Sequence, residues 1–161
     1  MKEIVLAGGC FWGAEKYLQS IHGVLSTAVG YANGKTSRPT YEQVCREGTD
    51  HAEVVRVGYD EARLPLGFLL RLFYEAIDPA SVNRQGNDRG VQYRTGIYYT
   101  DVSDRPAVEK SLADLQERLG KPVAVESGQL VQYCPAEDYH QKYLDKNPDG
   151  YCHIKPDAFK R

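Results

Sequence analysis

Residues 2–20 read KEIVLAGGCFWGAEKYLQS, and this stretch predicts how the fold begins. Residues 4–7 form a short β-prone run that ends at Gly8 and Gly9. From Cys10 onward, apolar side chains recur with the spacing of a helix. The stretch therefore predicts a strand, a tight glycine turn and a helix, with Cys10 at the N-terminus of the helix.

The same alternation of strands and helices continues along the chain. We expect strands at residues 24–31, 52–59, 93–100 and 122–126, and helices from about residue 40, at 66–76, at 103–120 and at 135–146. Thr40 and Gln43 have the spacing of a capping box, Ser103 is suited to cap a helix, and Pro135 is suited to a first helical turn. Residues 78–92 show no hydrophobic period and predict a long loop, and residues 147–161 are expected to be irregular.

The length and element order indicate one domain. A chain of 161 residues is long enough for a single hydrophobic core, and it contains no repeat or linker-like stretch. We therefore expect a single α/β domain over residues 1–161, built as a sheet covered by helices. Parallel and mixed pairing of the strands both remain open.

The composition excludes several classes of protein. The chain has 20 Lys and Arg against 22 Asp and Glu, a net charge of −2, and no basic run, so no nucleic-acid partner is expected. The apolar run near the N-terminus is too short for a signal peptide or a membrane span, so no membrane association is expected. The four cysteines are too few and too widely spaced for a disulfide-stapled scaffold. These features predict reduced thiols and a cytoplasmic location, unless a leader has been removed.

Cys10 is the sharpest chemical feature. Backbone N–H groups and positive partial charge at a helix N-terminus stabilise a thiolate, which is the nucleophile of redox and acyl-transfer chemistry. The adjacent Phe11 and Trp12 could wall an apolar pocket. The alternative is a buried structural cysteine beside two core aromatic residues.

Seven ordered motifs extend this feature over nearly the whole chain. They are GCFWGAE at 9–15, GYANG at 30–34, HAE at 51–53, NRQGND at 83–88, QYR at 92–94, AEDYHQ at 136–141 and GYC at 150–152. With them the sequence resembles the A-class peptide methionine sulfoxide reductases. The resemblance implies an α+β fold with a ferredoxin-like two-layer core, a mixed sheet and extensive irregular chain. It also implies a monomer that reduces the S epimer of methionine sulfoxide, free or in oxidised proteins, with thioredoxin as the reductant and no cofactor or metal.

The resemblance assigns Cys10 as the nucleophile and Glu53 as the acid that protonates the sulfoxide oxygen. The residues fit this chemistry, because attack on the sulfoxide sulfur places charge on its oxygen. Val55 and Val57 follow Glu53 on the same face of the predicted strand, so we expect that face to be apolar. Burial there raises the pKa of a carboxyl and would keep Glu53 protonated.

The resemblance also assigns the residues that hold the substrate. Tyr41 and Tyr93 match two hydroxyl donors to the sulfoxide oxygen. Phe11 and Trp12 match the pocket for the substrate methyl group, and an apolar box suits that group while the oxygen faces the donors. Asp88 matches a carboxylate that contacts the substrate backbone, although an aspartate in such a loop also commonly bonds its own turn.

Cys152 matches the family's resolving cysteine. Reduction of the sulfoxide leaves Cys10 as a sulfenic acid, which condenses with a second thiol to form a disulfide. Cys152 lies in the expected irregular C-terminal stretch, where the backbone could move toward Cys10. Cys134 departs from the family pattern, in which an aromatic residue is common, and we favour a small buried side chain over a disulfide relay; the role of Cys45 stays open.

Two alternative functions and a weaker third remain from the residues alone. A cysteine hydrolase would use Cys10 with His51 or His140 as a base. A non-enzymatic module would use the aromatic residues only to bind a ligand. A zinc site is the weakest, because no Cys-x-x-Cys spacing exists and the neighbours Cys152 and His153 are poorly suited to one tetrahedral metal.

Overall fold

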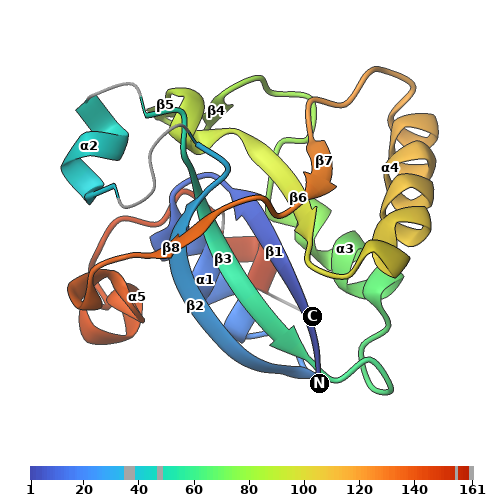
Figure 1. The fold of residues 1–161 in the computed structure, drawn as a ribbon, viewed down its shortest axis with the longest axis horizontal. Coiled ribbons are helices and arrows are strands. Elements are labelled where there is room, and N and C mark those ends of the chain that lie inside the picture. Colours follow the sequence, from blue (N-terminus) through green and yellow to red (C-terminus); the bar gives the residue numbers. More distant parts are fainter. Residues whose placement is uncertain (35–38, 47–48, 155, 160–161) are drawn as a thin grey trace.

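A curled mixed sheet forms the centre of the computed structural model, which describes residues 1–161 except 35–38, 47–48, 155 and 160–161 (Figure 1). The strands of this sheet lie in the order β7-β6-β1-β3-β2-β8. Their bounds are β1 Lys2–Gly8, β2 Val24–Ala32, β3 Ala52–Tyr59, β6 Thr95–Tyr99, β7 Glu126–Gln129 and β8 Tyr133–Pro135. All neighbouring pairs are antiparallel except β6 and β7, which are parallel, so the pairing left open by the sequence is mixed.

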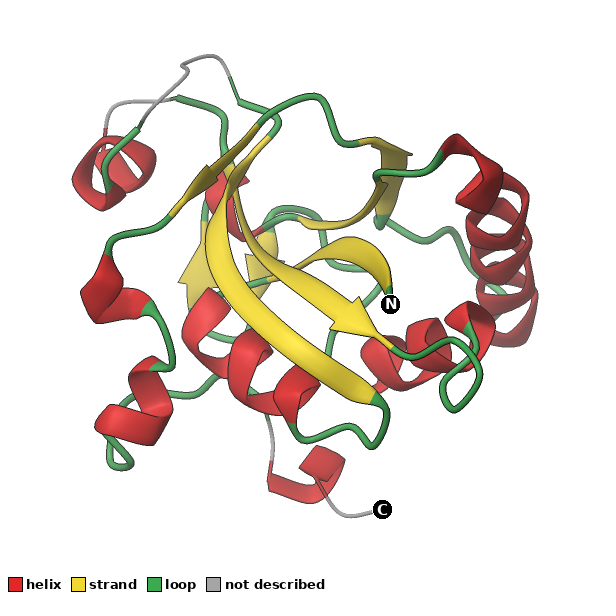
Figure 2. Cartoon of the chain, turned by 60° about the horizontal axis from the view of Figure 1, so that its bottom comes forward, coloured by secondary structure: helices red, strands yellow, loops and turns green. Residues whose placement is uncertain are grey.

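Helices pack on this sheet and extend beyond it. Their bounds are α1 Phe11–Gln19, α2 Tyr41–Arg46, α3 Leu66–Glu75, α4 Arg105–Leu119 and α5 Tyr143–Lys146. The chain order β1-α1-β2-β3-α3-β6 gives the spatial order β6-β1-β3-β2, which is the ferredoxin-like arrangement. The expected fold class is confirmed. Figure 2 shows α1 running along one face of the strands.

Alternation along the central strand β1 separates two apolar clusters. Ile4 and Leu6 belong to the cluster that includes α1 and α3, whereas Val5 and Ala7 point to the opposite face with Tyr98. All four β1 side chains are fully buried. Burial of an aliphatic side chain contributes about 1.5–3 kcal/mol, so both faces of β1 stabilise the fold.

Four local predictions need correction. The expected loop at 78–92 contains a hairpin of β4 Arg84–Gln85 and β5 Asp88–Arg89 and a 3₁₀ turn at Val91–Tyr93. The strand expected at 122–126 begins only at Glu126. Ser103 does not cap α4: its backbone N–H donates to the Asp101 side chain, which opens a 3₁₀ turn before the helix. The fourth is the helix expected at 135–146.

The prediction of a helix at residues 135–146 is wrong, because a side chain of this segment bonds to the backbone of β2. Pro135 ends β8, opposite Gly30. The Gln141 side chain accepts from Val29 N–H at 2.8 Å and donates to Val29 O at 2.9 Å, and Lys142 has a φ of 54°. Only a 3₁₀ turn at Asp138–His140 and the short α5 are helical. No helix in the described part of the chain is long and apolar enough to cross a membrane.

Candidate active site

Antiparallel pairing brings the predicted site residues to one end of the sheet. The start of β3, which carries Glu53, lies beside the end of β1 and the turn to Cys10, because the two strands run in opposite directions. Gly8 pairs with Thr95, so Tyr93 precedes β6 at the same end. Tyr41 begins α2, which follows the end of β2 at this edge (Figure 1).

The glycine turn places Cys10 at the N-terminus of α1, as predicted. Gly9 has a φ of +86°, a conformation that glycine adopts at little cost, and a Cβ there would lie 2.8 Å from Gln85 Cβ. Cys10 occupies the N-cap position and is 4% exposed. The side chain is therefore buried in the floor of the site.

The protonation of Cys10 differs from the sequence prediction. Backbone N–H groups of Trp12 and Gly13 lower its pKa, as expected at a helix N-terminus. Burial and the nearby charge of Glu53 raise the pKa of Cys10 by more than these groups lower it. The resting group is therefore a thiol.

Glu53 is the carboxyl that the sequence analysis singled out, and it is fully buried. Phe11 N–H donates to its Oε1 at 3.1 Å, and Oε2 has no hydrogen-bond partner within the described residues. Burial raises the pKa of Glu53 to about 8, against the lowering effect of the Phe11 N–H bond. The carboxyl is protonated at neutral pH and can donate through the unpaired oxygen.

Tyr41 and Tyr93 lie near this carboxyl. Burial, followed by the charge of Glu53, raises the pKa of both phenols. Charge on Cys10 adds to the same rise in both tyrosines. The two side chains are neutral hydroxyl donors grouped with the thiol and the carboxyl, as the sequence predicted.

Aromatic rings form a stacked wall beside these groups. The Tyr41 ring stacks at 6.2 Å from Phe11 and 6.4 Å from Trp12, between ring centroids. Trp12 also stacks on Tyr143 at 3.9 Å. Phe11 is fully buried, whereas Trp12 is partly exposed, so Trp12 is the more accessible of the two expected pocket residues.

His140 belongs to this wall, a role that could not be predicted from the sequence. Trp12 Nε1–H donates to His140 Nδ1 at 2.9 Å, and the His140 ring is 1% exposed and 4.4 Å from that of Tyr41. Burial lowers the pKa of His140, so it is neutral and accepts this bond. His140 lies in the motif AEDYHQ, but no local pattern in this motif indicates a hydrogen bond with Trp12, 128 residues away.

Asp88 and Cys152 also reach the site. Charge on Asp88 raises the pKa of Cys10, burial raises the pKa of Asp88 itself, and Asp88 Oδ2 is buried with no hydrogen-bond partner among the described residues. Cys152 lies over the first turn of α1, with Sγ 3.0 Å from the position of a Cβ on Gly13. The structure thus brings every sequence-predicted site residue to the end of the sheet that carries the glycine turn.

The other two cysteines lie on different elements. Cys45 is on α2, as predicted, and Cys134 is half-buried on the edge strand β8, opposite Tyr31. Cys134 is thus more exposed than the small buried side chain we favoured. All four cysteines are thiols, with no disulfide between them.

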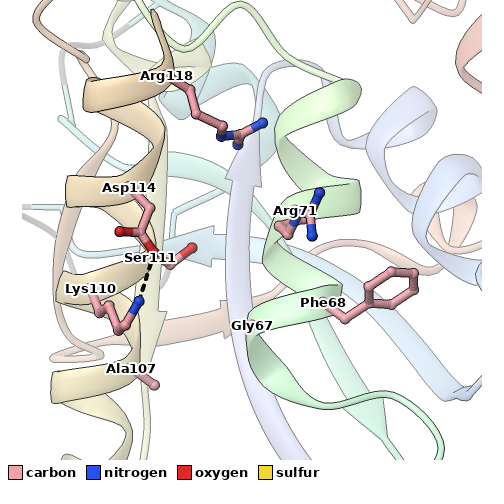
Figure 3. A pocket seen from close by; sticks show the side chains of 8 residues that line it. All are labelled: Gly67, Phe68, Arg71, Ala107, Lys110, Ser111, Asp114 and Arg118. Carbon is pink, nitrogen blue, oxygen red and sulfur yellow. Dashed lines mark hydrogen bonds and ion pairs between the residues drawn. The ribbon is translucent and has the colours of Figure 1, made fainter.

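A separate cavity of the protein carries no predicted catalytic group. A cavity of about 620 Å³ lies between α3 and α4, and Phe68 and the ion pair of Lys110 with Asp114 line it (Figure 3). None of the predicted site residues lines this cavity. Within the described residues, no cluster of three His, Cys, Asp or Glu side chains could hold a metal ion.

A buried thiol beside a protonatable carboxyl, neutral hydroxyl donors and a second thiol is the set of groups that a thiol-dependent reductase requires. A model of the peptide methionine sulfoxide reductase family matches residues 2–161, and the chain belongs to that family. A peptide methionine sulfoxide reductase MsrA from Lachnoclostridium phytofermentans is 61% identical over 158 residues, which cover 98% of this chain and 95% of that protein. The protein is therefore an enzyme that reduces methionine sulfoxide.

Solved structures agree with this assignment. Mxr1 from Saccharomyces cerevisiae in reduced form has a TM-score of 0.88 at 38% identity, over 96% of this chain and 91% of that one. Mxr1 in complex with Trx2 has a TM-score of 0.63 at 24% identity, over 88% and 84% of the two chains, and shares the fold. The predictions of family and enzyme class are confirmed. The cysteine hydrolase and the binding module find no support.

Proposed function

We propose that the protein, as a single-domain monomer, reduces the S epimer of methionine sulfoxide, free or in proteins, with Cys10 as the nucleophile. Glu53 protonates the sulfoxide oxygen, and Tyr41 and Tyr93 donate hydrogen bonds to it. The observation that carries this proposal is the buried Glu53, with a pKa of about 8 and an Oε2 that has no partner within the described residues. A carboxyl in that state is a proton donor at neutral pH.

The proposed step transfers one oxygen atom. Cys10 Sγ attacks the sulfoxide sulfur and forms an S–S bond, and the proton on Glu53 neutralises the charge that develops on oxygen. The S–O bond of the substrate and this S–S bond then break as the oxygen moves to Cys10 Sγ, and methionine leaves. Glu53 regains a proton from the Cys10 thiol, so the carboxyl ends as it began. The sulfoxide is reduced by two electrons to methionine, and Cys10 is oxidised to a sulfenic acid.

Substrate orientation follows from the division of the site. Trp12, backed by the buried Phe11, offers an apolar surface to the methyl group, while the hydroxyl donors and the carboxyl face the oxygen. Asp88 stays a candidate for contact with the substrate backbone. Only one sulfoxide epimer satisfies both sides at once, and the family resemblance implies that this is the S form.

Regeneration is proposed to proceed through a Cys10–Cys152 disulfide. Thioredoxin is the proposed reductant, the class of partner that the family resemblance implies, and Mxr1 has been solved with Trx2 bound. Cys152 is partly exposed and lines a cavity of about 490 Å³. The four thiols suit a reducing compartment, and we place the protein in the cytoplasm.

Single-turnover reduction without external reductant tests the chemical step. We expect Cys10→Ser to form no methionine while keeping the fold. Glu53→Gln should slow methionine formation at saturating S epimer about 100-fold or more, with less than about threefold change in half-saturation, because the acid acts on charge in the transition state. A Glu53→Gln rate equal to that of the parent would transfer the acid role to Tyr41 and Tyr93.

A further inference from the structure

Gly9 and Gly13 leave space for side chains at the N-terminus of α1, and Cys152 and His153 of the C-terminal segment occupy this space. A Cβ on Gly9 would lie 2.9 Å from His153 Nε2. A Cβ on Gly13 would lie 3.0 Å from both Cys152 Sγ and His153 Nδ1. Glycine inside a helix costs about 1 kcal/mol relative to alanine. At Gly13 the missing side chain leaves room for the close approach of Cys152 and His153.

His153 ties this segment to the turn that positions Cys10. Its Nε2 donates to the backbone carbonyl of Gly8 at 2.7 Å, across 145 residues of sequence. Burial lowers the pKa of His153, so the ring is neutral, with its hydrogen on Nε2. The bond fixes the residue next to Cys152 directly beside the glycine turn.

The thiol of Cys152 is held less tightly than its neighbour. The contact of its Sγ with Ile154 O is 3.8 Å long, which is weak even for sulfur. Cavities of about 490 Å³ and about 390 Å³ flank the segment, the first lined by Cys152 and the second by His153. The side chain of Cys152 thus has room to turn while His153 stays bonded.

We propose that His153 is a positioning residue for disulfide formation, which holds Cys152 over the helix N-terminus where the Cys10 sulfenic acid forms. This inference rests on the assignment of Cys152 as the resolving cysteine. In the step that His153 assists, Cys152 Sγ attacks Cys10 Sγ, the S–S bond forms, and the Cys10 S–O bond breaks. The hydroxide leaves with the Cys152 proton as water, so no external oxidant is consumed.

The size of the effect follows from proximity. A thiol held beside its target reacts at a high effective concentration, and a tether that swings free lowers that concentration. Loss of the Gly8 bond releases the residue adjacent to Cys152 from the turn. The Cys10 sulfenic acid should then persist after methionine has been released.

Two substitutions separate the hydrogen bond from the bulk of the ring. His153→Leu fills space but has no donor for Gly8 O, whereas His153→Gln places an amide N–H₂ near the position of Nε2. His22→Leu is the matched control, because His22 is an exposed histidine in the loop between α1 and β2. Thermal unfolding of each variant checks that the fold is kept.

The experiment follows one turnover with methionine sulfoxide and no reductant, by quenched flow. Methionine release reports the first step, and loss of two thiols reports the disulfide. We expect His153→Leu to release methionine within about twofold of the parent rate and to form the disulfide at least tenfold more slowly, with a sulfenic acid that dimedone traps. His153→Gln should recover disulfide formation to within about threefold, and His22→Leu should match the parent.

Disulfide formation at the parent rate in His153→Leu overturns the proposal. So does equal slowing in the Leu and Gln variants, which would mark a purely structural role. If His153→Leu fails to fold, Gly13→Ala tests the same contact, because its methyl group would lie against Cys152 and His153. An unchanged ratio of the rate of disulfide formation to the rate of methionine release in Gly13→Ala then refutes the inference. Failure of the underlying assignment is separate: in that case Cys152→Ser would still lose two thiols per turnover.

Discussion

Burial is the largest influence on the protonation states of Cys10 and Glu53. Cys10 sits where a helix N-terminus favours a thiolate, yet desolvation and Glu53 hold its pKa high. The same desolvation keeps Glu53 protonated. In the proposed step the two effects are complementary: Glu53 retains the proton that it donates to the substrate oxygen, and the carboxylate that this leaves accepts the proton of the Cys10 thiol.

The buried carboxyl makes stability depend on pH. Its pKa rises from about 4.5 to about 8 on folding, so the folded state binds the proton more tightly. This contribution is fully present below pH 4.5 and is lost as the pH rises through 8; its upper limit is about 5 kcal/mol. Urea unfolding at pH 5, 7 and 9 should show the parent losing stability relative to Glu53→Gln. Parallel pH profiles would contradict the raised pKa.

Motif recognition identified the residues proposed to react, but not the groups that hold them. Cys10 and Glu53 were identifiable because each lies in a short motif with a stated chemical need. His140 was not, because its bond to Trp12 joins positions 128 apart and leaves no local pattern. Asp101 was missed as a cap because Ser103, two residues later, has an equally good capping side chain.

His140 should control the orientation of the aromatic wall. Trp12 is the only tryptophan of the chain, so its fluorescence reports that wall directly. His140→Leu leaves the indole N–H without its acceptor, and we expect a shifted emission maximum and a KM about tenfold higher. His140→Asn keeps an acceptor near the position of Nδ1 and should restore both. Identical spectra and KM in parent and His140→Leu would exclude this role.

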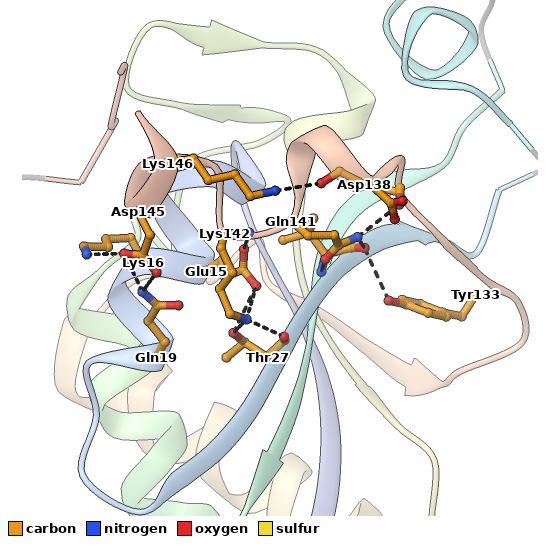
Figure 4. Close-up of polar contacts among 12 residues, drawn as sticks. Glu15, Lys16, Gln19, Thr27, Tyr133, Asp138, Gln141, Lys142, Asp145 and Lys146 are labelled. Carbon is orange, nitrogen blue, oxygen red and sulfur yellow. Dashed lines mark hydrogen bonds and ion pairs between the residues drawn. The ribbon is translucent and has the colours of Figure 1, made fainter. Parts of the chain in front are cut away.

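Among the elements, the segment after β8 shows where sequence periodicity fails. Residues 135–146 carry helix-like spacing, but their polar side chains bond across to α1 and β2 (Figure 4). Glu15 accepts from the backbone N–H and Nζ of Lys142 at 2.7 and 2.9 Å and from Thr27 Oγ1 at 3.0 Å. Such long-range partners outweigh local helix propensity. Elements such as β1 and α1 formed as predicted, because their pattern of apolar residues agrees with the faces that they bury.

Gln141 is the test of that explanation. Its side chain satisfies both backbone groups of Val29, as a neighbouring strand would. Gln141→Ala should lower the free energy of unfolding by about 1–3 kcal/mol, because it leaves the partly buried N–H of Val29 unpaired, whereas Val29 O still accepts from the Ala136 N–H. Gln19→Ala, which removes exposed bonds to Asp145, is the control and should cost less than about 0.5 kcal/mol. Equal losses in the two variants would show that the β2 contact is not what holds the segment.

For the whole molecule, the sheet brings together the residues proposed for the first step, and the C-terminal segment carries the proposed second thiol. The strand order β6-β1-β3-β2 places the end of β1 between the starts of β3 and β6. These residues are held by paired strands. Cys152, in contrast, belongs to irregular chain after α5. A rigid centre suits transition-state stabilisation, and irregular chain suits the proposed role of Cys152, whose thiol would first meet Cys10 and then an external reductant.

This division predicts that loss of Cys152 spares chemistry and blocks recycling. Cys152→Ser should release about one methionine per enzyme and then stall with thioredoxin, because thioredoxin attacks a disulfide and this variant cannot form the Cys10–Cys152 bond. Dithiothreitol, which reaches the sulfenic acid directly, should restore turnover. Cys134→Ser is the matched control and should turn over with thioredoxin like the parent. Mass spectrometry after one turnover should find the Cys10–Cys152 link in the parent and an oxidised Cys10 in the variant; full thioredoxin-driven turnover of Cys152→Ser would instead assign resolution to Cys134 or Cys45.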